Sequence, residues 1–312
     1  MENLLFSINV VSPMFLIMCL GVFLRKIKLF DEAFLKTANN FTFKALLPIL
    51  LFYNIYNSNL SISFNGKLVF FAVGSVLTII ALLFIIVPKF EKNNKNRGVL
   101  IQGLYRSNFV LFGIPICTNI FGEASTGITS MLIAIIVPLY NFFAVIILDI
   151  YSKDKVEIKS TIVSIMKNPL IIGSIAGIIL SLLEVKLPTA IENTISDLAK
   201  IATPLALILL GGEFQIGNVY KNIKYIVVVC LGKLVVIPAI VFSIAIMIGF
   251  KGVELGALLA MMASPVAVSS FIMAQQYNAN DELAGQIVFL STTFSAITIF
   301  IFTYIFKVTG IF

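Results

Sequence analysis

The chain has 312 residues, of which 59% are hydrophobic and 12% are charged, and its mean hydropathy is +1.05. This composition excludes a soluble globular domain, and apolar runs of about 20 residues exclude a β-barrel of short alternating strands. The chain has no histidine, and its three cysteines show no metal-binding or disulfide spacing, so we expect no metal, no cofactor and no enzymatic site. We predict an all-α polytopic membrane protein.

Ten apolar segments follow one another along the chain. They lie at about 6–24, 38–56, 68–88, 99–119, 128–150, 169–184, 198–214, 223–249, 254–276 and 284–306. The first segment is not a cleavable signal peptide, because Glu2 precedes it and Arg25, Lys26 and Lys28 follow it. The pattern predicts ten transmembrane helices.

The net charge of +7 comes from basic residues whose distribution predicts an orientation. With the N-terminus outside, the expected cytoplasmic loops hold fourteen Lys and Arg residues. The outer loops hold five, namely Lys67, Lys186, Lys200, Lys251 and Lys307. This bias predicts a multi-pass protein of the cell membrane with both termini outside. It also explains the basic residues without any binding of nucleic acid.

Helix-breaking residues recur at a separation of half the chain, which indicates an internal repeat. Pro13 matches Pro169, and Pro48 matches Pro204. Two halves of five segments would have opposite orientations in the membrane, because each half crosses it an odd number of times.

The repeat predicts three parts of the chain. We expect a first five-helix repeat at 1–150, a short cytoplasmic linker at 151–168 and a second, inverted five-helix repeat at 169–312. No loop is long enough to form a soluble domain.

The fourth segment of each half contains a proline among small or polar residues. The first of them carries Asn108, Gly113 and Pro115, so we expect its helix to break or kink near Gly113 to Pro115, where proline removes a backbone donor. The second carries Ser264 and Pro265. Interrupted helices at corresponding positions are typical of a transporter's binding site. If they cross near the midplane, their half-helix N-termini suit a carboxylate or another anion.

The candidate substrate-binding residues lie at these breaks or on polar positions that could face them. They are Asn108, Gly113, Pro115, Ser264, Pro265, Ser269, Lys233 and Asn54. Asn108 offers donors and an acceptor, and Lys233 is unusually deep for a charge, so it could pair with Glu213, a backbone carbonyl or the substrate. The alternative for polar residues is a role in contacts between helices.

Other charged and polar residues leave two interpretations open. Arg106 could attract anions or anchor the helix at the inner headgroups, and Asn141 could line the cavity or join two helices. Glu213 lies near a segment end and is expected at the interface. No buried acid stands out as a proton carrier or a sodium ligand, so uniport driven by the membrane potential is one option.

Four stretches resemble the auxin efflux carrier family. They are RSNFVLFGIP at 106–115, IFGE at 120–123, TPLALILLGGEF at 203–214 and SPVAVSSFIMAQQYNANDELAGQIVFLSTTFS at 264–295. The resemblance covers nearly the whole chain. The family includes plant auxin carriers and bacterial transporters associated with malonate or malate. It is related to the bile-acid, arsenite and riboflavin-type carriers with inverted repeats.

The resemblance implies ten helices in two inverted five-helix repeats, with broken fourth and ninth helices that cross at the substrate. It also implies a homodimer, and a transport domain that moves against a scaffold domain in an elevator mechanism. We therefore predict a secondary transporter that moves small organic anions, either auxin-like or malonate/malate-like mono- or dicarboxylates, by alternating access. The alternatives are a sodium-coupled symporter like the bile-acid family, or a channel or receptor.

Overall fold

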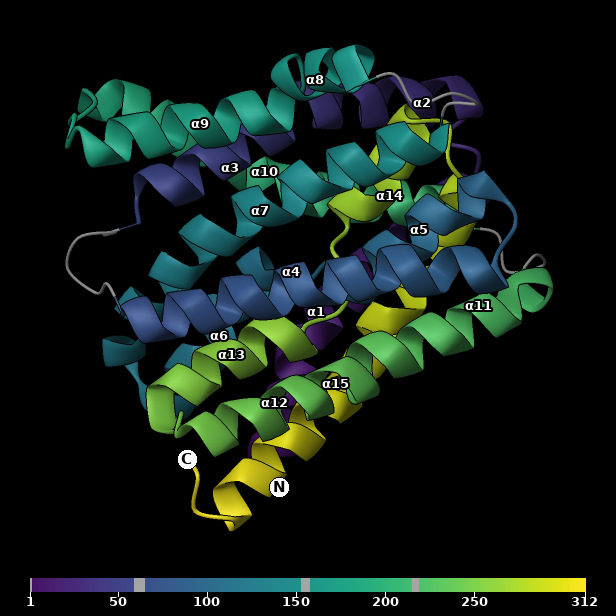
Figure 1. Ribbon diagram of the computed structural model, residues 1–312. Helices are drawn as coiled ribbons and strands as arrows, with labels where there is room; N and C mark the ends of the chain where they lie inside the picture. Colours follow the sequence, from purple (N-terminus) through teal and green to yellow (C-terminus); the bar gives the residue numbers. More distant parts are fainter. Residues whose placement is uncertain (1, 59–64, 153–157, 215–218) are drawn as a thin grey trace.

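The computed structural model describes residues 2–58, 65–152, 158–214 and 219–312, and these ranges contain helices and no strand (Figure 1). Six helical stretches in the described ranges are long and apolar enough to cross a membrane. They are α4 (Gly66–Phe90), α5 (Asn94–Tyr105) with α6 (Phe109–Phe121), α7 (Thr126–Ser152), α10 (Thr189–Glu213), α11 (Val219–Leu231) to α12 (Ile237–Ile248), and α15 (Asp281–Val308). The prediction of an all-α membrane protein is confirmed at this level.

The other described α-helices accompany these spans. They are α1 (Glu2–Lys26), α2 (Glu32–Phe41), α3 (Leu47–Tyr56), α8 (Ile158–Met166), α9 (Pro169–Leu182), α13 (Gly252–Ala263) and α14 (Ser269–Gln276). The ten apolar segments of the sequence fall on these helices and spans. That all ten cross the membrane as two inverted repeats stays a prediction.

Part of the expected linker at 151–168 is helical. It contains α8, whose Ser164 hydroxyl donates a hydrogen bond of 3.0 Å to Oδ1 of Asp149 in α7. Its residues 153–157 lie outside the described residues. The division of the chain into two repeats stays a prediction.

Five helices (α1, α2, α3, α9 and α10) pack into what we call the glycine-packed group, in which glycines bring the backbones of α1 and α10, and of α3 and α9, close together. In it α1 packs along α10, and α3 runs beside α9 at one edge of the molecule (Figure 1). A Cβ atom added to Gly211 would lie 2.0 Å from the carbonyl oxygen of Met18, and one added to Gly173 would lie 2.5 Å from that of Pro48. Only glycine permits such an approach, which is typical of helices packed within membranes.

The remaining spans form what we call the crossing group (α4 to α7 and α11 to α15). Within it α13 packs on α6, α7 packs on α5 and α6, and α15 packs on α11 and α14. Large apolar side chains such as Phe109, Phe112 and Met131 are completely buried in its interior. α1 and α10 also contact α15 and connect the two groups.

Two helical stretches widen into a π-helical turn just before a proline. These turns are Thr42–Leu46, before Pro48, and Gly232–Val236, before Pro238. In the second turn, the amide of Ile237 donates to the carbonyl of Gly232, five residues earlier. Such π turns inside α-helices are frequent at functional sites. This one carries Lys233, which is fully buried.

Candidate functional site

Two helices of the crossing group are interrupted, and their interruptions meet. The first break separates α5 from α6 at residues 106–108, where Arg106 has an extended backbone (φ −83°, ψ 128°). The second separates α13 from α14 at residues 264–268, where Ser264 is also extended (φ −60°, ψ 146°). The interrupted fourth and ninth segments of the sequence correspond to these two breaks.

The first break does not lie at Gly113 to Pro115, where we expected a break or a kink. The chain leaves the helix at Arg106 to Asn108, and α6 then continues through Gly113 and Pro115. Pro115 is exposed on α6, and the helix continues past it although proline removes one backbone donor. A Cβ atom added to Gly113 would lie 2.9 Å from the ring of Phe109, so this glycine serves packing instead.

The two breaks satisfy each other's backbone groups. The amide of Asn108 donates to the carbonyl of Pro265 at 2.8 Å, and the hydroxyl of Ser107 donates to the carbonyl of Ser264 at 3.3 Å. Unpaired backbone groups at membrane depth need such partners. Ser264 and Pro265 therefore contribute through their main chain, and the hydroxyl of Ser264 donates to the carbonyl of Ala260 in its own helix.

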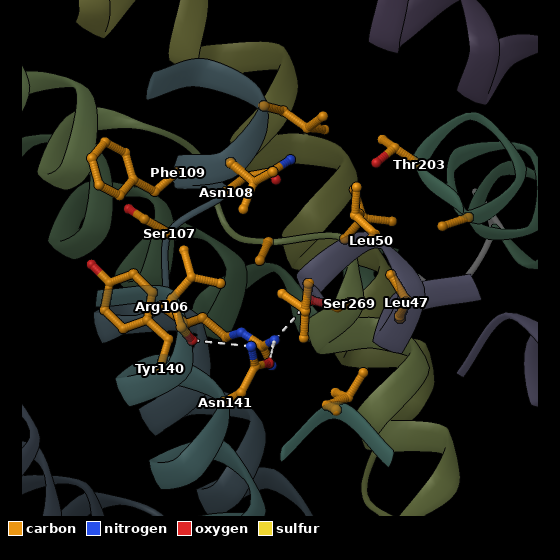
Figure 2. Close-up of a pocket in the computed structure, with 18 residues that line it drawn as sticks. Leu47, Leu50, Arg106, Ser107, Asn108, Phe109, Tyr140, Asn141, Thr203 and Ser269 are labelled. Carbon is orange, nitrogen blue, oxygen red and sulfur yellow. Dashed lines mark hydrogen bonds between the residues drawn. The ribbon is translucent and has the colours of Figure 1, made fainter. Parts of the chain in front are cut away.

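Arg106 is a buried cation at the first break, with 3% of its surface exposed. Its Nη2 donates to Oδ1 of Asn141 at 2.5 Å and to Oγ of Ser269 at 2.8 Å, as Figure 2 shows. Its Nη1 donates to Oε1 of Gln102 at 3.3 Å and lies 2.8 Å from Sδ of Met273. All these partners are neutral, and no salt bridge to Arg106 occurs among the described residues.

Lys233 is a second buried cation and lies behind the first break. Its Nζ donates to the hydroxyl of Ser107 at 2.6 Å and to the carbonyl of Met262 at 3.0 Å. Met262 lies in the last turn of α13, where the helix dipole favours a positive charge. Of the partners considered for Lys233, the backbone carbonyl is confirmed and Glu213 is wrong, because Glu213 contacts Asn39 and Gln275.

Both breaks, with α3, α7, α9 and α10, line a cavity of about 50 Å³ (Figure 2). Its polar wall consists of Arg106, Ser107, Asn108, Tyr140, Asn141, Thr203 and Ser269. Its apolar wall includes Leu47, Leu50, Leu51, Val137 and Leu170. The volume is far below the several hundred Å³ of an ordinary ligand pocket, so the described conformation is closed around this site.

The structure separates the candidate residues into four sets. Asn108 and Ser269 line the cavity, whereas Ser264 and Pro265 form the second break beside it. Lys233 contacts the cavity wall only through Ser107.

Three candidates lie away from this wall. Gly113 and Pro115 lie farther along α6, and Asn54 lies on α3, where its Nδ2 is buried without a hydrogen-bond partner among the described residues. None of the three lines the cavity.

Sequence reasoning underrated Arg106 and missed Tyr140 and Thr203. Arg106 directly follows α5, and its position two residues before Asn108 was the available signal. Asn141, a polar residue in the apolar run of α7, gave a weaker signal. Tyr140 and Thr203 resemble ordinary residues of membrane helices, so only the packing of α7 and α10 brings them to the cavity.

Comparisons with known proteins cover nearly the whole chain. A family model described as a membrane transport protein matches residues 6–303. An uncharacterized transporter of Methanocaldococcus jannaschii is 24% identical over 304 residues, which cover 93% of this chain and 96% of the relative. The family match therefore includes both breaks and all the residues of the cavity wall.

Proposed function

Because the chain belongs to the membrane transport protein family, which is the auxin efflux carrier family, we propose that it is a secondary transporter of small organic anions. The family is one of membrane transporters and not of enzymes. The observation that carries the anion class is Arg106, a buried guanidinium on the cavity wall whose hydrogen-bond partners among the described residues are neutral. A buried charge of this kind is costly until an opposite charge joins it.

A carboxylate fits the donors of this wall. Arg106 can exchange its neutral acceptors for two parallel hydrogen bonds to a carboxylate, which are stronger than bonds to neutral groups. The side-chain amide of Asn108 and the hydroxyl of Ser269 supply further donors. α6 and α14 begin at the two breaks, so the positive ends of both half-helix dipoles add to the attraction. We propose auxin-like or malonate/malate-like mono- or dicarboxylates as the substrates.

Transport requires the closed cavity to open to each side of the membrane in turn. In our proposal the crossing group moves as a unit against the glycine-packed group, in an elevator movement. This division is supported by the close backbone contacts within the glycine-packed group and by the hydrogen bonds that hold the two breaks together. We further propose ten helices in two inverted repeats and a homodimer in the cell membrane, with both termini outside.

The test is uptake of labelled malonate, malate and indole-3-acetate into proteoliposomes, with sodium, pH and voltage gradients imposed one at a time. We expect saturable uptake and counterflow of at least one acid. Arg106→Gln should weaken the apparent affinity for the transported acid by about tenfold or more, because a hydrogen bond between two charged groups is lost. Arg97→Gln, an arginine of α5 outside the cavity wall, is the matched control.

Four outcomes would contradict the proposal. If folded protein transports none of the three acids, the organic-anion class is wrong. Unsaturable flux without counterflow would indicate a channel. Strict dependence on sodium would indicate a symporter like the bile-acid family, and equal loss in both arginine variants would remove the special role of Arg106.

A further inference from the structure

A second polar site lies where α2, α10 and α14 meet. Its centre is Glu213, the last residue of α10, which is only partly exposed. Nδ2 of Asn39 in α2 donates to Oε1 of Glu213 at 2.8 Å. Nε2 of Gln275 in α14 donates to Oε1 and Oε2 at 3.1 Å and 3.3 Å. One carboxylate therefore binds both the glycine-packed group and the crossing group.

The two amides are only half satisfied. Oδ1 of Asn39 and Oε1 of Gln275 are buried and accept no hydrogen bond among the described residues, and Asn39 is 0% exposed. A buried acceptor without a donor is costly. An ionised carboxylate has no donor to offer them, whereas a protonated one carries an O–H group. If either amide turns by 180°, its oxygen can accept that O–H in place of the N–H bond that the amide now donates, so a proton on Glu213 exchanges one hydrogen bond for another and removes the negative charge from the link.

Water-sized space reaches the carboxylate. Glu213 lines a cavity of about 570 Å³ and a neighbouring one of about 180 Å³. The charged groups that face it are Arg25 at the end of α1, Glu32 and Lys36 in α2, Lys95 in α5, and Asp281 and Glu282 in α15. Of these, Arg25 pairs with Glu32 at 3.5 Å, and Glu32 is 93% exposed. A proton can thus reach Glu213 through the larger cavity.

The short helix α14 connects this site with the substrate cavity. Its first residue, Ser269, accepts the hydrogen bond from Arg106, and its seventh, Gln275, donates to Glu213. Between them, Phe271, Ile272 and Met273 are almost fully buried, so the helix is packed tightly along its length. A change at Gln275 is therefore transmitted to the residue that holds Arg106.

We propose that Glu213 is a proton-binding site that acts as a latch between the two helix groups. In the ionised form, the carboxylate binds Asn39 and Gln275 together and holds α14 against α2 and α10. A proton taken from the larger cavity onto Glu213 replaces one N–H donor by an O–H bond to the turned amide. This weakens the link and frees α14 to move with the crossing group. When Glu213 ionises again, the proton returns to the same cavity. The control of transport by this latch rests on the proposed function.

The first measurement does not depend on transport. Infrared difference spectra of the purified protein between about pH 8 and about pH 5 should show a protonated-carboxyl band, which Glu213→Gln removes. Glu32→Gln, a carboxylate on the wall of the same cavity, is the matched control and should keep the band. A protonated-carboxyl band that Glu213→Gln leaves at full intensity overturns the proposal.

The second measurement is counterflow of the transported acid over the same pH range. The wild type and Glu32→Gln should change several-fold in rate, whereas Glu213→Gln should be insensitive to pH. If Glu213→Gln does not fold, Gln275→Leu keeps the carboxylate, removes one donor from it and should move the pH profile upward. An unchanged profile in the folded variant overturns the latch. If the wild type transports no acid, the proposed function fails, while the infrared band still decides whether Glu213 binds a proton.

Discussion

The two helix breaks meet at one cavity but are built from opposite kinds of groups. The first, at 106–108, has no proline and supplies donors: the guanidinium of Arg106, the hydroxyl of Ser107 and the amide of Asn108. The second, at 264–268, contains Pro265 and no charged residue, and it supplies main-chain acceptors. In the proposed function, this difference assigns anion binding to the first break, which the carbonyl groups of the second hold in place.

Lys233 strengthens this division of roles. It donates to Ser107 of the first break and to the carbonyl of Met262 just before the second, so it joins the breaks from the side away from the cavity. Two positive groups thus lie at the crossing, one on the wall and one behind it. We expect side chains that connect the two breaks, such as Ser107, to affect stability, and Asn108, whose side chain lines the cavity, to affect binding.

The largest effect should come from Ser107→Ala, which breaks the connection between the two breaks. It removes the hydroxyl that donates to the carbonyl of Ser264 and takes one of two acceptors from the buried amine of Lys233, which keeps the carbonyl of Met262, so we expect a loss of about 2 kcal/mol in the free energy of unfolding. Thermal and denaturant unfolding of the purified protein would measure it. Ser243→Ala removes an exposed hydroxyl of α12 and should stay near the wild type. Equal stability of both variants would contradict the connection.

Asn108→Ala should weaken anion binding without a loss of stability. Its backbone amide still donates to Pro265, so the protein should remain folded and monodisperse. Loss of the side-chain amide should weaken anion binding by about fivefold, the equivalent of about 1 kcal/mol for one hydrogen bond. Binding of the transported acid is the measurement, and Asn119→Ala, an exposed asparagine of the same helix, is the control. Wild-type binding by Asn108→Ala would remove this residue from the site.

The smallest effect should come from Pro115→Ala. This proline is exposed in the middle of α6 and lies off the cavity wall, so we expect a change within about 0.5 kcal/mol in stability and unchanged uptake. Thermal unfolding and proteoliposome uptake would measure both. A strong loss of transport by a stable Pro115→Ala protein would mean that the working break extends into α6.

The amino-acid sequence by itself determined the helical membrane class and the interruption of two segments. Continuous apolar runs can satisfy their backbone only as helices in a bilayer, so composition and length were sufficient. It also marked Asn108, Ser264, Pro265 and Ser269 as unusual positions within these two segments, because polar residues and prolines in apolar helices are rare enough to be noticed.

Only the tertiary structure decided where the first helix breaks and which groups face the cavity. A helix can leave its path wherever another chain segment takes over its backbone hydrogen bonds. Here the carbonyl of Pro265, distant in sequence, does so for Asn108, and Pro115 does not break α6. The same reason applies to Glu213, which lies at a segment end in the sequence. Its partners Asn39 and Gln275 come from helices 174 and 62 residues away, and only packing brings their amides to one carboxylate.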